Sequence, residues 1–186
     1  MTLEKAYHYY KDRISEVSKF SSWGDVWVFL MCSSFIEYLV KMVNNEDKVG
    51  SKKYIAFIRE YLTIVDPRYS TFKYNNGECD LPEQMYYILR CGIVHSFSLI
   101  PDTKGKKKNA RARSILLSHE KNGGVHLERF NGSIDAVIFT AEGFCRDLDS
   151  LVEYIFKKHA FENKEIEENI ISWLTHYPPI AFLSGN

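Results

Sequence analysis

The sequence is poor in the features that mark disulfide-stapled, secreted or membrane-spanning proteins. It has only four cysteines in 186 residues, and no two of them form a C-x-x-C pair. This usage is typical of reduced thiols that pack as small apolar side chains, not of a disulfide framework. The N-terminal segment is charged and amphipathic, unlike a signal peptide, and the longest apolar run, residues 26–32, is too short to cross a membrane. We therefore expect a cytoplasmic protein that makes no membrane contact.

Common functional signatures are also missing. The chain contains no G-x-x-x-x-G-K-[ST], G-x-G-x-x-G, H-E-x-x-H or G-x-S-x-G motif, so the familiar patterns of nucleotide binding, zinc proteolysis and serine hydrolysis are excluded. His119 and His126 flank an expected turn, but two histidines without a third ligand make a poor metal site. We expect no metal and no cofactor.

Apolar and aromatic side chains, by contrast, are plentiful. They make up 45% and 15% of the residues, which is enough to offset the entropy of ordering a chain of this length in one domain. We expect most of the aromatic side chains to pack in the core.

Apolar residues recur three or four positions apart over most of the chain, which predicts a mainly α protein, a bundle of five to six helices. Caps and breakers set the boundaries: Thr2 and Asp80 are suited to begin helices, and Asp66-Pro67 to end one. The expected helices cover residues 2–19, 26–44, 52–65, 81–97, 141–159 and 163–175.

Residues 114–139 change period. Short, partly alternating runs are separated by Asn-Gly and Gly-Gly steps, which are hairpin signals. We expect a small antiparallel β-hairpin, of two or three strands, inserted in a helical domain of residues 1–160. Residues 161–186 would form a C-terminal helix and tail packed on that domain.

One pair of polar residues stands out because its helix is otherwise apolar. Arg90 and His95 lie in the run LRCGIVHSF, and a buried guanidinium must be paired. One interpretation is structural: Arg90 pairs with a buried acid, for which Glu37 is the candidate, and His95 bonds a nearby carbonyl. The other is chemical, since imidazole titrates near neutral pH and guanidinium binds phosphate.

The spacing Arg-x4-His in this context resembles the Rx4-6H motif of the HEPN superfamily of small helical domains. The upstream helix around Glu37 is similar to the earlier core helix of that family, which often carries an acid. The resemblance covers residues 1–160, with residues 114–139 as an insertion. Many catalytic members have a polar residue directly after the arginine, whereas this chain has Cys91.

The resemblance implies a metal-independent endoribonuclease of defence or toxin type that works as a homodimer. Arg90 would stabilise the phosphate, His95 would be the general acid or base, and Glu37 and Ser96 would support them. On a regular α-helix, residues five apart differ by about 140° in direction and about 7.5 Å along the axis, so two motifs facing each other across a dimer fit one phosphate better. The alternative is a non-catalytic HEPN-like scaffold that dimerises and holds a partner.

A basic stretch follows the motif. Six cations and no anion occur in residues 104–113, in a chain whose 24 basic and 24 acidic side chains otherwise cancel. Near a ribonuclease site such a loop would attract RNA through its phosphates; otherwise it is a solvated loop. The candidate RNA-binding residues are Lys104, Lys106, Lys107, Lys108, Arg111 and Arg113. An antitoxin-like protein is a further expected partner.

Overall fold

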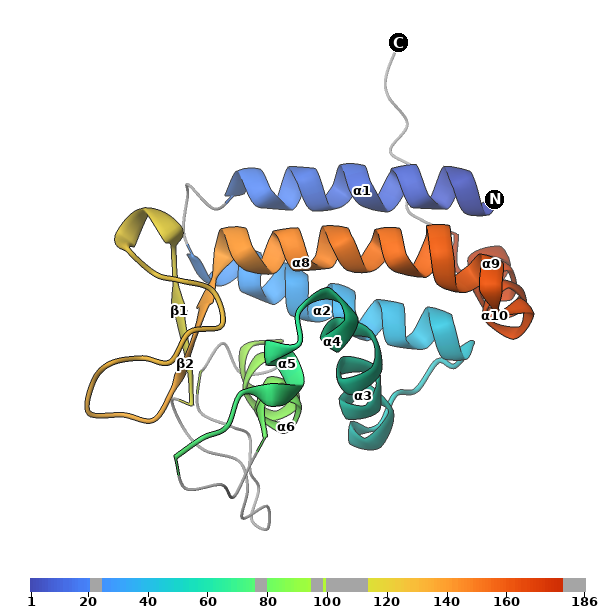
Figure 1. The fold of residues 1–186 in the computed structure, drawn as a ribbon. Coiled ribbons are helices and arrows are strands. Elements are labelled where there is room, and N and C mark those ends of the chain that lie inside the picture. Colours follow the sequence, from blue (N-terminus) through green and yellow to red (C-terminus); the bar gives the residue numbers. More distant parts are fainter. Residues whose placement is uncertain (21–24, 76–79, 95–98, 100–113, 179–186) are drawn as a thin grey trace.

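The computed structural model describes residues 1–20, 25–75, 80–94, 99 and 114–178, and in them the chain forms a helical bundle with a small sheet at one end (Figure 1). Besides the short 3-10 helix η4 (Glu120–Asn122), seven continuous helical runs are present in this part of the chain, where five to six helices were expected. Four of them are single α-helices: α1 Leu3–Lys19, α2 Asp25–Asn44, α5 Arg68–Thr71 and α10 Lys164–His176. The other three include a π-helical part, also labelled η. They are α3 Ser51–Phe57 with η2 Ile58–Leu62 and α4 Thr63–Val65; α6 Leu81–Gln84 with η3 Met85–Ile93; and α8 Ala141–Glu153 with η5 Tyr154–His159 and α9 Ala160–Glu162.

Six of the helical runs lie where they are predicted, because the apolar spacing that marks each helix also marks the face that it buries; the helix α5 was not expected, and residues 95–97 of the expected helix 81–97 lie outside the described residues. Thr2 caps α1 by accepting from the backbone N–H of Lys5, and Asp80 caps α6 by accepting from that of Glu83. At α3 the cap is Gly50, and Ser51 is already helical.

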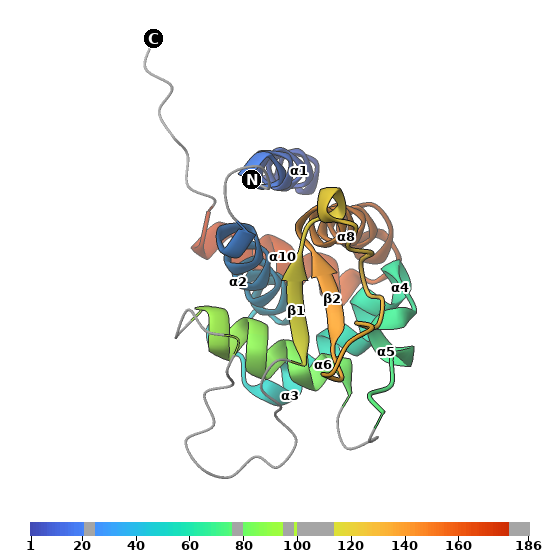
Figure 2. The same cartoon turned by 90° about the vertical axis from the view of Figure 1, so that its left-hand side faces the viewer.

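Helix α2 lies at the centre of the bundle. It contacts α1, α3, η3, α8, α10 and β1, while α1 runs alongside α8 on the other side of the molecule from α3 (Figures 1 and 2). The aromatic side chains fill the core as expected: Phe29, Tyr54, Tyr69 and Phe144 are fully buried. These large rings account for much of the apolar area removed from water.

By length and composition alone, residues 26–44 of α2 are apolar enough to cross a membrane. Half of that segment is buried inside the fold, and core helices of soluble proteins pass the same test. The cytoplasmic location stays a prediction.

The expected antiparallel hairpin is wrong. Strand β1 (Ile115–Ser118) pairs with β2 (Val137–Thr140) in parallel, with Ile115 opposite Val137. The chain turns away after β1 through the 3-10 helix η4 (Glu120–Asn122), and residues 127–130 then return antiparallel to β2. They form a single isolated bridge, Arg129 to Val137, instead of a hairpin strand. Alternating polarity marks extended segments but does not say which of them become neighbours.

The C-terminal helix α10 joins the same core as the rest of the bundle. Its Ile170, Trp173 and Leu174 are buried with residues of α2, and the amide of Asn169 donates to the carbonyl of Val43 at 2.9 Å. This helix therefore packs against the rest of the bundle, and the tail from residue 179 lies outside the described residues.

Candidate functional site

The helix that carries Arg90 begins in regular form and then widens. Asp80 and Pro82 start it as α6, and from Met85 to Ile93 it is a π-helix. The π-helical stretch therefore includes Arg90 and the three residues after it, and His95 lies outside the described residues.

Arg90 is held side-on by Glu37 of α2. Its Nε donates to Glu37 Oε2 at 3.1 Å and its Nη2 to Glu37 Oε1 at 3.2 Å. The side chains are 20% and 17% exposed, so the pair lies at the edge of the core. The predicted pairing of these two residues is confirmed, and it fixes the plane of the guanidinium.

A second cation shares the same carboxylate. Lys41, one helical turn after Glu37, places Nζ 3.2 Å from Glu37 Oε1. Burial by itself would raise the pKa of Glu37, but the hydrogen bond and charge of Arg90, helped by Lys41, outweigh it and hold the pKa below its ordinary value. Two cations around one anion leave this cluster with a net positive charge.

Among the described residues, Arg90 also lies near a thiol and two tyrosines. Nη1 of Arg90 lies 3.7 Å from Sγ of Cys91, and the guanidinium lies 5.6 Å from the ring centre of Tyr86. The hydroxyl of Tyr54 is buried beside the pair without a hydrogen-bond partner among the described residues, and burial raises its pKa. Nη1 is the edge of the guanidinium that the Glu37 carboxylate leaves unused.

The rest of the predicted site lies outside the described residues. This holds for His95 and Ser96, and for the basic stretch Lys104, Lys106, Lys107, Lys108, Arg111 and Arg113. Of the four predicted core site residues, the structure brings together Arg90 and Glu37.

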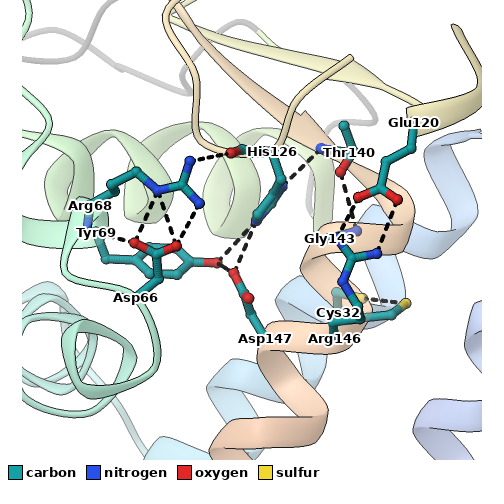
Figure 3. Close-up of polar contacts among 11 residues, drawn as sticks. Cys32, Asp66, Arg68, Tyr69, Glu120, His126, Thr140, Gly143, Arg146 and Asp147 are labelled. Carbon is teal, nitrogen blue, oxygen red and sulfur yellow. Dashed lines mark hydrogen bonds and ion pairs between the residues drawn. The ribbon is translucent and has the colours of Figure 1, made fainter. Parts of the chain in front are cut away.

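A second polar cluster, around His126, was not anticipated from the sequence (Figure 3). Nδ1 of His126 accepts from the backbone N–H of Thr140 at 3.0 Å, so the ring proton of a neutral His126 lies on Nε2. Nε2 lies 3.1 Å from Oδ2 of Asp147, which also accepts from the hydroxyl of buried Tyr69 at 2.7 Å. Because both ring nitrogens are engaged inside the fold, this histidine links β2 to α8 and has no lone pair left for a substrate.

Two further contacts hold His126 in this position. Arg68 donates to the backbone carbonyl of His126 at 2.8 Å and is itself held by Asp66. Gly143 gives the imidazole room, since a Cβ there would lie 2.4 Å from Cγ of His126. The only sequence signal was the Thr140-x-x-Gly143 start of α8, which predicts the helix but not its contact with His126.

His119 belongs to a different network from His126. Its Nδ1 lies 3.0 Å from Oε1 of Glu142, and neighbouring Glu120 pairs with Arg146. Within the described part of the chain, no group of three His, Cys, Asp or Glu side chains is placed to hold a metal ion.

Comparison of the chain with family models, with curated proteins and with solved structures finds no match. The resemblance to the HEPN superfamily therefore depends on the motif residues themselves. The mainly helical fold is compatible with it, but fold alone does not define an activity.

Proposed function

We propose that the protein is a HEPN-like, metal-independent endoribonuclease that acts as a homodimer, with Arg90 and His95 as its catalytic pair. The observation that carries the proposal is the net positive charge of the cluster of Arg90, Lys41 and Glu37, in which the carboxylate orients the guanidinium and leaves its Nη1 unused. A guanidinium oriented before substrate arrives loses little entropy when it binds a phosphate.

Each residue has a role in cleavage of an RNA phosphodiester. His95 removes the proton of the 2′-hydroxyl or protonates the leaving 5′-oxygen. Arg90 stabilises the negative charge that develops on the phosphate through the edge that Glu37 leaves unused, and Lys41 adds positive charge. The products are a 2′,3′-cyclic phosphate and a free 5′-hydroxyl, with no metal involved.

The dimer is part of this proposal because residues five apart on a regular helix face about 140° apart. Two motifs facing each other in a dimer would supply both groups from both chains. In a defence or toxin system, an antitoxin-like partner would cover the surface on which the two motifs meet.

The second candidate is a non-catalytic HEPN-like scaffold that dimerises and holds a partner. One observation favours it: Glu37 already neutralises Arg90, and Cys91, in place of a polar residue, contacts its free edge. In this case the pair serves the stability of the fold alone.

Cleavage of a structured RNA in EDTA and low salt separates the two candidates. Wild type, Arg90→Ala and His95→Ala are compared with two control variants: Arg59→Ala, which removes the guanidinium of an exposed ion pair, and His176→Ala, which removes an exposed imidazole. We expect wild type and both controls to leave 2′,3′-cyclic phosphate ends, and the two motif variants to lose at least about 100-fold in rate. Absence of cleavage by folded wild type, or equal rates in all five proteins, would move the assignment to the scaffold.

A further inference from the structure

Two cysteines that are far apart in the sequence meet in the core. Cys32 on α2 and Cys145 on α8 are 113 positions apart, yet their sulfur atoms lie 3.8 Å from each other. The contact is drawn at Cys32 in Figure 3. Both residues are buried, with 2% and 3% of their surface exposed. A pair of thiols in van der Waals contact needs only side-chain rotation and small helix shifts to bond.

The two thiols are not equivalent. The hydrogen bond from the Cys32 thiol lowers the pKa of Cys145 against the opposing effect of burial, and neighbouring Arg146 adds to the lowering while Glu142 opposes it. The same hydrogen bond, with burial, raises the pKa of Cys32. The thiolate, which is the reactive form, is therefore favoured at Cys145.

Cys145 is also the thiol with wider access. It lines an apolar cavity of about 380 Å³ between α1, α2 and α8, together with Cys32, Val17 and Leu30. It lines a second, more polar cavity of about 590 Å³ as well, beside Arg146 and Asp149. A molecule as small as hydrogen peroxide fits either space.

We propose that Cys32 and Cys145 are a modification site at which hydrogen peroxide forms an internal disulfide, with Cys145 oxidised first and Cys32 resolving. The Cys145 thiolate attacks the peroxide: an S–O bond forms, the O–O bond breaks, and hydroxide leaves and takes up the proton that Cys145 has lost. The Cys32 sulfur then attacks the sulfenic acid: the S–S bond forms, the S–O bond breaks, and the second hydroxide takes the Cys32 proton. Two thiols and one peroxide become one disulfide and two waters.

Cys91 provides the internal comparison. It is half-buried beside Arg90, and among the described residues it has no thiol partner. If exposure alone decided reactivity, Cys91 would be oxidised first. If the contact between the two core thiols decides it, Cys32 and Cys145 are oxidised first. The proposal is independent of ribonuclease activity.

The test is a peptide map of the wild-type chain after treatment with a small molar excess of hydrogen peroxide, unfolding and alkylation. We expect a cross-linked pair of peptides containing Cys32 and Cys145, with a mass two hydrogens below the sum of the two peptides. The cross-link should form before any oxidation of Cys91 and should disappear after treatment with dithiothreitol. Full alkylation of both cysteines, earlier oxidation of Cys91, or sulfinic acid at Cys145 without a cross-link would overturn the proposal.

Two variants show which of the two cysteines is oxidised first. Cys32→Ala should trap a sulfenic acid on Cys145 that a dimedone probe labels, and Cys145→Ala should leave Cys32 unlabelled. Labelling of Cys32 in preference to Cys145 would contradict the assigned order. Because the cross-link is read in the wild-type chain, a variant that fails to fold does not obscure the result.

Discussion

The carboxylate of Glu37 balances two cations from different directions, Arg90 on η3 and Lys41 on its own helix. All three groups lie at the edge of the core, where solvent screens them in part but does not replace their hydrogen bonds. Gly143 has an equally local effect at the second cluster, since its missing side chain makes room for His126. Single substitutions at these positions therefore test the two clusters separately.

Glu37→Gln should lower the free energy of unfolding by about 1–2 kcal/mol at pH 7, because Arg90 and Lys41 lose their common anion. The pKa of Glu37 is lowered in the folded state, so the advantage of wild type is complete above the unfolded-state pKa and is lost as pH falls through the folded-state pKa. Urea unfolding at a series of pH values from neutral to acid measures this difference.

The matched control is Glu168→Gln, which removes a carboxylate from an exposed pair with Lys164. Glu168→Gln should change the free energy of unfolding only slightly at every pH. A pH-independent gap between wild type and Glu37→Gln would contradict the assigned charge interaction.

Gly143→Ala should destabilise the fold by about 3 kcal/mol, because the new methyl group would overlap the ring of His126 and the hydroxyl of Thr140. Gly50→Ala is the control, since a Cβ there meets nothing within 4 Å and its φ of −83° suits alanine. Because Gly50 is the cap of α3, where glycine is preferred to alanine, we expect Gly50→Ala to cost at most about 1 kcal/mol in thermal or urea unfolding. Equal effects at the two glycines would show that His126 is not locked as described.

Helix caps fix where the helices that carry the two polar clusters begin. Asp80 and Pro82 start the helix of Arg90, which is π-helical from Met85 to Ile93. Across the core, β2 runs directly into α8, with Thr140 capping the helix through the N–H of Gly143. The caps thus place both polar clusters.

Asp80→Ala should cost about 1 kcal/mol of stability, because the backbone N–H of Glu83 loses its acceptor at 3.0 Å. Asp80→Asn keeps that acceptor and should lose less than half as much, although both variants lose the surface ion pair with Arg59. Urea unfolding of the three proteins gives the comparison. Equal losses in the two variants would assign the effect to the ion pair instead of the cap.

The whole molecule has no net charge, so long-range attraction of RNA depends on where its cations lie. The basic stretch of residues 104–113 is the densest group of cations in the chain. In the proposed enzyme it works with a dimer in which two copies of the motif face each other. Sedimentation of the full chain should then give twice the 21.7 kDa of one copy.

Replacing Lys106, Lys107 and Lys108 by glutamine should weaken cleavage at low salt and flatten its dependence on salt. Each lost phosphate contact reduces the log–log slope by about 0.7 for single-stranded RNA. A control with the same loss of charge replaces Lys5, Lys52 and Lys121, which are exposed on other elements. Identical slopes for both triple variants would mean that the basic stretch does not bind RNA.

Local patterns in the chain predicted six of the seven helical runs in the described residues and made Glu37 the candidate partner of Arg90. Helical periodicity and caps act over a few residues, and a guanidinium in an apolar helix requires an acid, for which an apolar helix with one glutamate supplied the candidate. The parallel direction of the sheet, the engagement of His126 by Asp147 and Tyr69, and the meeting of Cys32 with Cys145 were decided by tertiary structure. Each joins segments far apart in the chain, and their proximity depends on how whole helices pack, which no local spacing encodes.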